Sequence, residues 1–262
     1  MASKLGRNQA LDTALFAAAG SGDDPSLHTP SRPAYAPCDG PRTEINEPCV
    51  LLTKSDAFSI VSLEGALHEN HDRGAAAILP DGTALFACLD GHGAEGASVS
   101  AYATRNLLAG AASALDLGKS PTEAVESAFA RTSATMAKHV TDCRFSGSTA
   151  ILTIMKHTPQ GRSLTTGWVG DSRAVLGRNR IIAGPARIST KLESVALTRD
   201  HKPTEPKERQ RLLEARAIVR PSRVINPHSG AWIEVGAVRV WDASQIYGVA
   251  MSRSLGDMQV CT

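Results

Sequence analysis

A short acidic motif carries residue types that could bind a metal ion. Asp90 follows the apolar run Ala84–Leu89, so its carboxylate is held rigidly at the end of an expected strand. Gly91 follows it, and a residue without a side chain lets a backbone carbonyl approach an ion. Such hard oxygen ligands suit Mg²⁺ or Mn²⁺, and the next residue, His92, has a pKa suited to proton transfer. Taken alone, the motif could also be an ordinary Asp-Gly turn with a solvated histidine.

A second motif, Gly170-Asp171-Ser172-Arg173, lies between two apolar stretches. Asp171 fits a turn residue of a hairpin. Arg173 is a plausible member of a surface ion pair. By itself this motif decides nothing.

The motifs are expected to lie among strand hairpins and helices, in the order hairpin, two helices and then further hairpins. Pro80-Asp81-Gly82-Thr83 predicts a turn between strands Ala75–Leu79 and Ala84–Leu89. Helices are expected at Glu95–Leu108, after the Ser120 cap with Pro121 and Glu123, and at Glu205–Arg216. Further strands are expected at Thr149–Met155, Leu164–Val169, Arg173–Leu176, Ser194–Thr198 and Val249–Ser252, and a long surface loop at Arg220–Gly236. This order predicts an α+β fold, because strands and helices do not alternate as β-α-β units.

The composition of the chain separates a leader from a domain and excludes several classes of protein. Residues 1–48 are rich in Gly, Ser, Asp and Pro and predict a flexible, disordered leader with one short helix near Leu11–Ala18, followed by a domain over residues 50–262. The net charge of +2 marks no nucleic-acid partner, and no apolar run reaches the roughly 20 residues that span a bilayer. The five cysteines include no C-x-x-C pair, which argues against a zinc site or disulfide framework and favours the cytoplasm or nucleus.

Five motifs in order resemble those of the protein phosphatase 2C (PPM-type) family of metal-dependent protein serine/threonine phosphatases. They are Phe86-Ala87-Cys88-Leu89-Asp90-Gly91-His92-Gly93, Ser146-Gly147-Ser148-Thr149-Ala150, Trp168-Val169-Gly170-Asp171-Ser172-Arg173-Ala174, Leu197-Thr198-Arg199-Asp200-His201-Lys202-Pro203 and Ala250-Met251-Ser252-Arg253-Ser254-Leu255-Gly256-Asp257. In addition, Glu69-Asn70-His71-Asp72-Arg73 resembles the family's E-N-Q-D-R. The resemblance covers about four-fifths of the chain, and a different metal hydrolase that shares D-G-H-G by accident does not explain the ordered set.

The resemblance implies a four-layer α-β-β-α sandwich with two antiparallel sheets and a site for two Mg²⁺ or Mn²⁺ ions. It implies that Asp72, Asp90 and the Gly91 carbonyl ligate the ions and that a metal-activated water attacks phosphorus. His92 would protonate the leaving oxygen, and Asp171 matches an aspartate that can help to hold a third ion. Asp257 and Arg253 are expected to be structural. Phosphoprotein substrates and a monomeric state are the expected partners and assembly, with no nucleic acid and no membrane.

Two departures from the family pattern favour an alternative. The chain ends before the family's S-D-G-x-W-D and D-N segments, so the C-terminal part of the domain is expected to be missing. Leu67 stands where many members have an arginine that clamps phosphate, which leaves the substrate-binding residues unknown. The alternative is a catalytically impaired pseudophosphatase that acts as a phosphoprotein-binding or regulatory module.

Overall fold

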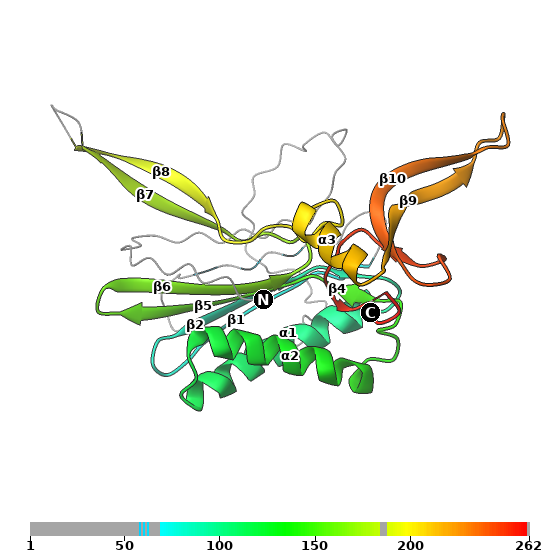
Figure 1. Ribbon diagram of the computed structural model, residues 1–262. Helices are drawn as coiled ribbons and strands as arrows, with labels where there is room; N and C mark the ends of the chain where they lie inside the picture. The colour runs from blue at the N-terminus through cyan, green and yellow to red at the C-terminus, as the bar shows by residue number, and fades with distance from the viewer. Residues whose placement is uncertain (1–57, 59, 61, 63–68, 184–187, 261–262) are drawn as a thin grey trace.

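A computed structural model describes residues 58, 60, 62, 69–183 and 188–260 (Figure 1). The expected leader, its short helix at Leu11–Ala18 and Leu67 lie outside the described residues. The described part forms a mixed α/β fold with antiparallel sheets and three helices, as the sequence predicts. None of these helices combines the length and apolar character that crossing a bilayer requires.

A four-stranded antiparallel sheet in the order β1-β2-β5-β6 forms the centre. Its strands are β1 (Arg73–Ile78), β2 (Ala84–Leu89), β5 (Ala150–Thr158) and β6 (Gly161–Val169). The predicted β1–β2 hairpin is confirmed: the Thr83 amide donates to the Asp81 carboxylate at 2.9 Å, and Gly82 has a φ of 80° that glycine adopts without strain. Leu85, Ala87 and Leu89 alternate along β2 and are buried, because every second side chain faces the core.

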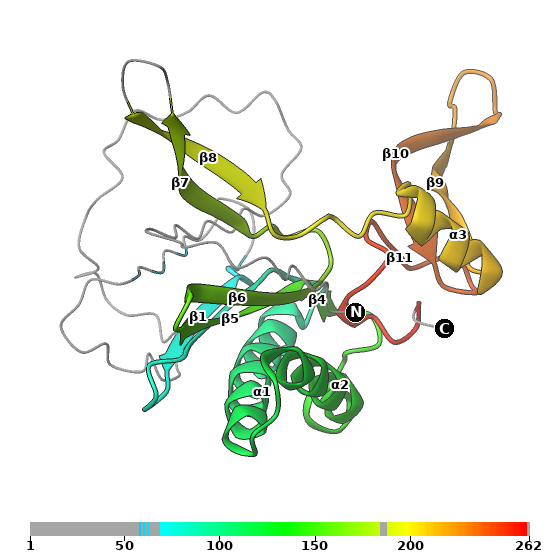
Figure 2. The same cartoon turned by 60° about the vertical axis from the view of Figure 1, so that its left-hand side comes forward.

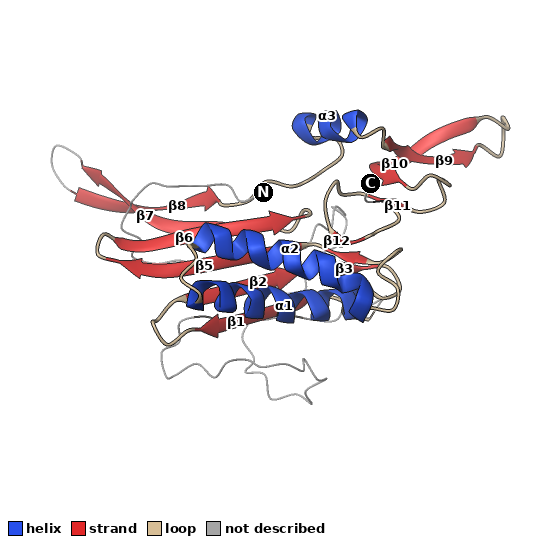
Figure 3. Cartoon of the chain, turned by 60° about the horizontal axis from the view of Figure 1, so that its bottom comes forward, coloured by secondary structure: helices blue, strands red, loops and turns tan. Residues whose placement is uncertain are grey.

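Helices α1 (Gly96–Asp116) and α2 (Pro121–His139) lie side by side on one face of this sheet (Figure 3). Their inner faces pack Val99, Leu107 and Met136 against strand residues such as Leu152. The predicted capping box is present, since the Ser120 side chain accepts from the Glu123 amide and Glu123 accepts from the Ser120 amide. α1 continues past the predicted end at Leu108, because the alanine-rich stretch that follows favours helix and buries Ala111 and Ala114.

Two hairpins extend away from the central sheet on opposite sides (Figures 1 and 2). One pairs β7 (Val175–Ala183) with β8 (Ile188–Ala196), and both strands are longer than the predicted Arg173–Leu176 and Ser194–Thr198. The other joins β9 (Ile218–Ile225), β10 (Trp232–Trp241) and the short β11 (Gly248–Val249), which is shorter than the predicted Val249–Ser252. α3 (Pro206–Glu214) lies between them. In the described residues these strands belong to two separate sheets, so the single second sheet of a four-layer sandwich stays a prediction.

The prediction of a loop at Arg220–Gly236 is wrong. These residues form most of the β9–β10 hairpin, and strand pairing is interrupted at the turn between Asn226 and Ala231 and at the bulge that contains Gly236. Pro221 does not break the ladder, because it lies opposite Val238, at a bulge in β10. The Pro, Gly and Asn content thus marked one turn and one bulge.

A small sheet in the order β12-β4-β3 joins three of the sequence motifs. It pairs β3 (Gly91–His92) with β4 (Gly147–Ser148), and β4 with β12 (Leu255–Gly256). This pairing places the Asp90–Gly93, Ser146–Ala150 and Ala250–Asp257 motifs next to one another. Of the cysteines in the described part, Cys88 and Cys143 are free thiols.

Candidate active site

Asp72 and Asp90 come together at one end of the central sheet. Asp72 directly precedes β1 and Asp90 directly follows β2, and the terminal residues Arg73 and Leu89 pair across the ladder. Burial raises the pKa of Asp90, and the negative charge of Asp72 raises it further, to about 6. The exposed Asp72 and the partly buried Asp90 therefore lie near each other at the same end of the sheet.

The backbone of Asp90 is held in place by the Ser146–Ala150 motif. Its amide donates to the Thr149 hydroxyl at 2.9 Å, and its carbonyl accepts from the Thr149 amide at 2.9 Å. The Ser148 hydroxyl donates to the same carbonyl at 3.1 Å. Thr149 in turn shares a 2.7 Å hydrogen bond with Ser172 of the second acidic motif. These bonds connect three motifs around Asp90.

Gly91 is packed too closely for any other residue. A Cβ atom there would lie 2.3 Å from the Gly96 carbonyl oxygen and 2.9 Å from that of His71. The glycine therefore lets β3 approach the start of α1, which holds the Asp90–His92 segment against the helix. This close approach explains the glycine by packing, in addition to the metal-ligand role predicted for its carbonyl.

His92 contacts Asp257, a residue expected from its motif to be structural. Nε2 of His92 lies 2.8 Å from the Asp257 carboxylate, whose side chain is 1% exposed. Burial lowers the pKa of His92, but the hydrogen bond to Asp257 and the charges of Asp257, Asp90 and Asp171 outweigh it, so the pKa is raised. Burial alone would raise the pKa of Asp257, but hydrogen bonds from His92, Ser254 and Tyr247 hold it below its usual value. Asp257 thus belongs to the site.

Asp171 is buried and forms an ion pair with Lys202. The ion pair links the second acidic motif to the Leu197–Pro203 motif, and the His201 amide adds a 2.9 Å bond to the Gly170 carbonyl. Arg173 forms a two-bond ion pair with Asp200 at 2.8 and 2.9 Å, as expected for a surface pair. A third ion at Asp171 would have to compete with the Lys202 ammonium.

The chemistry of Asp72, Asp90 and the Gly91 backbone fits a hard divalent cation. The mutual repulsion that raises the pKa of Asp90 is the interaction that a bound cation would relieve. Within residues 69–183 and 188–260, no group of three or more His, Cys, Asp or Glu side chains is arranged to hold a metal ion.

Comparison with known proteins places the chain in a family. The family described as "Protein phosphatase 2C" matches residues 59–262. A rice relative (Oryza sativa subsp. japonica), "Probable protein phosphatase 2C 12", is 40% identical over 122 residues, which cover 45% of this chain and 26% of the relative. An Arabidopsis thaliana relative, "Probable protein phosphatase 2C 72", is 30% identical over 220 residues, which cover 77% of this chain and 59% of the relative. The chain belongs to the protein phosphatase 2C family.

A solved structure supports the fold. Serine-threonine phosphatase 2C from Toxoplasma gondii matches with a TM-score of 0.52 at 17% identity, covering 76% of this chain and 66% of that chain. Identity this low shows a shared fold alone. The chain spans only 26% and 59% of the length of the two curated relatives.

Sequence reasoning missed the role of several residues at the site. Lys202 was visible only as part of a motif, and Thr149 only as a strand entry. Tyr247, which donates to Asp257 at 2.7 Å, lies in no motif at all. No local pattern could have shown these partners, because each contact joins segments that are distant in sequence.

Proposed function

We propose that the chain is a metal-dependent protein serine/threonine phosphatase that hydrolyses phosphoserine and phosphothreonine in phosphoprotein substrates. One observation carries the proposal: Asp72 and Asp90 lie at the paired ends of β1 and β2, close enough for the charge of Asp72 to raise the pKa of Asp90, and His92 lies two residues after Asp90. Family membership supports it, because the matched relatives are named as protein phosphatases.

In this proposal one group of residues binds the metal ions and His92 transfers a proton. Asp72, Asp90 and the Gly91 carbonyl would hold Mg²⁺ or Mn²⁺. When bound, these cations supply Lewis acidity that lowers the pKa of an attacking water and offsets the phosphoryl charge. His92 would give a proton to the serine or threonine oxygen as the bond to phosphorus breaks, a contribution of about 10²–10⁴ in rate.

Release of phosphate from a phosphoserine or phosphothreonine peptide tests the proposal. We expect release with Mn²⁺ that stops on addition of a chelator, and near-complete loss in Asp90→Asn. Asp81→Asn is the matched control, because Asp81 is an exposed carboxylate that caps the β1–β2 turn. Full activity in Asp90→Asn would show that the mechanism is wrong.

A second candidate is a pseudophosphatase that binds phosphoproteins without turnover. It is favoured by the absence, among the described residues, of a group of three or more side chains that could hold a metal ion. Calorimetric titration with Mn²⁺ separates the two candidates. Heat that saturates and disappears in Asp90→Asn supports the enzyme, and no heat at millimolar metal supports the binding module.

A further inference from the structure

We propose that Asp257 is a positioning residue that fixes the ring orientation and tautomer of His92, so that Nδ1 is the nitrogen that delivers the proton. The inference rests on the proposed function for its catalytic meaning. It goes beyond that function in assigning a role to a residue 165 positions away from His92 in the sequence.

Asp257 is held as a rigid acceptor. It is fully buried, and its φ of 49° lies in the left-handed region that non-glycine residues seldom adopt. One carboxylate oxygen, Oδ2, accepts from both His92 and Ser254, and the other, Oδ1, accepts from Tyr247 at 2.7 Å. Both oxygens are thus engaged by donors from three segments, which leaves the carboxylate one orientation.

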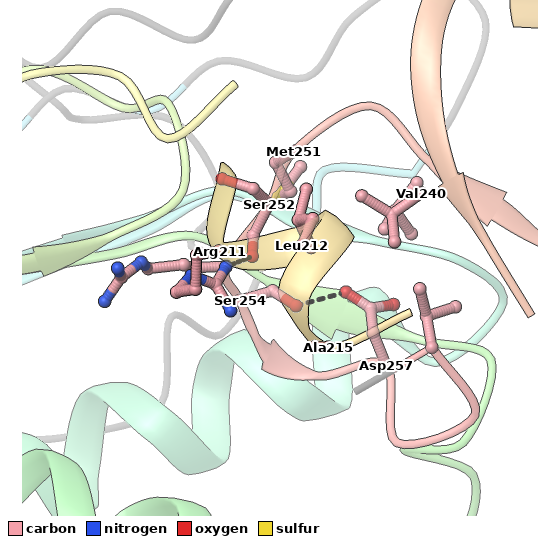
Figure 4. A pocket seen from close by; sticks show the side chains of 11 residues that line it. Arg211, Leu212, Ala215, Val240, Met251, Ser252, Ser254 and Asp257 are labelled. Carbon is pink, nitrogen blue, oxygen red and sulfur yellow. Dashed lines mark hydrogen bonds between the residues drawn. The ribbon is translucent and has the colours of Figure 1, made fainter. Parts of the chain in front are cut away.

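The backbone at Gly147 lies very close to both His92 and Asp257. A Cβ atom at Gly147 would lie 2.4 Å from Asp257 Oδ2 and 2.7 Å from His92 Nε2. Only glycine therefore leaves room for the His92–Asp257 contact, on the strand that pairs with both β3 and β12. Asp257 and Ser254 also line a cavity of about 200 Å³, together with Arg211 and Leu212 of α3 (Figure 4).

The hydrogen bond decides which ring nitrogen is available. An ionised carboxylate accepts only, so Nε2 of His92 must carry a hydrogen. Nδ1 is then the ring nitrogen left to exchange a proton with the substrate. As in serine-protease triads, the buried carboxylate holds the imidazole and stabilises its cation without taking the proton.

Every proton is accounted for in the proposed hydrolysis of the phosphate ester. The oxygen of the attacking water forms a bond to phosphorus, the bond between phosphorus and the serine or threonine oxygen breaks, and that leaving oxygen takes the Nδ1 proton. The attacking water loses a proton, and a proton from solvent or from this water restores Nδ1. Asp257 keeps its charge throughout.

A first experiment measures the tautomer of the His92 ring and does not depend on phosphatase activity. Nitrogen-15 NMR of the His92 ring in the full chain should show a hydrogen on Nε2 in the wild type, in slow exchange with water. Asp257→Asn should remove that signal or move the hydrogen to Nδ1. An unchanged His92 spectrum in Asp257→Asn would overturn the proposal.

A second experiment uses the leaving group. A serine alkoxide leaves poorly without a proton, whereas the phenolate of p-nitrophenyl phosphate leaves without one. Asp257→Asn should lower kcat for a phosphoserine peptide by about 100-fold and kcat for p-nitrophenyl phosphate only severalfold, with KM little changed. Equal losses for both substrates would contradict a positioning role.

Two controls separate positioning from folding. Glu208→Gln alters another buried carboxylate that contacts Arg253 and Ser252, so it should lower both rates together. On a His92→Ala background, Asp257→Asn should cause no further loss with the peptide, because the two residues act as one unit. If the wild type hydrolysed neither substrate, the proposed function would fail while the NMR result still decided the role of Asp257.

Discussion

The negative charge of Asp90 would favour binding of a cation, but it destabilises the folded protein when no cation is bound. The side chain is partly buried and next to Asp72, and both conditions disfavour its charged form, which raises its pKa to about 6. At pH 7 in the absence of metal, the folded protein therefore holds a carboxylate that would be better solvated in the unfolded chain. This cost is what the proposed cation site would impose when no cation is bound.

Asp90→Asn should separate the two effects. In the presence of a chelator at pH 7, we expect the free energy of unfolding to rise by about 1–2 kcal/mol, because the amide removes the repulsion with Asp72. Phosphate release with Mn²⁺ should be lost in the same variant. Urea unfolding at pH 7 measures the first effect, and the difference from wild type should shrink towards pH 4, where the wild-type carboxyl is protonated. A destabilised variant in chelator would show that Asp90 is not strained by its surroundings.

At the scale of the elements, α2 depends on its first turn. The Ser120–Glu123 capping box satisfies amides that the helix itself leaves without partners. Ser120→Ala should lower the free energy of unfolding by about 0.5–2 kcal/mol. Ser133→Ala is the matched control, because Ser133 is exposed within α2, where alanine is a better helix former. Thermal unfolding of both variants measures the effect, and equal melting temperatures would contradict a role for the cap.

Elements with local signals were predictable from the sequence. The β1–β2 turn and the Ser120 cap depend on residues two or three positions apart, and both are confirmed. The end of α1 was missed because its last turns are alanine-rich and lack a strong apolar pattern. There Gly118, with a φ of 79°, follows the helix end.

The β9–β10 hairpin was missed for a different reason. Its outer strand residues include exposed Ile225 and Trp232, so the alternation expected of a half-buried strand is absent. At the site, the motifs identified Asp72, Asp90 and His92, but the contacts of His92 with Asp257 and of Asp257 with Tyr247 are tertiary. Residue types and spacing cannot show a contact between distant segments.

At the scale of the whole molecule, Glu208 connects α3 to the segment that carries Asp257. Its carboxylate accepts two hydrogen bonds from Arg253, one from Ser252 at 2.8 Å and one from Arg211 at 3.0 Å. Burial opposes ionisation of Glu208, but these donors outweigh it and lower the pKa from 4.5 to about 2. Arg253 thereby ties its segment to α3.

The shifted pKa of Glu208 predicts how stability depends on acid. A lowered pKa stabilises the folded state above the ordinary value of 4.5, and this contribution is lost as the pH falls towards about 2. Glu208→Gln should therefore lower the free energy of unfolding at pH 7 by on the order of 3 kcal/mol. The difference from wild type should narrow between about pH 4.5 and 2, as measured by urea unfolding across that range. A difference that is constant with pH would contradict the ionic role.

The contact between His92 and Asp257 also sets an order of events during synthesis. The ribosome releases Asp72, Asp90 and His92 early, while Asp257 follows 165 residues after His92. A nascent chain can build the β1–β2 hairpin and α1 from neighbouring residues, but β12 cannot join β4 until nearly the whole described chain has emerged. Because such distant pairings form slowly, the acidic end of the sheet would exist for a time with an unanchored His92, and the His92–Asp257 pair would form only in the last stage of folding.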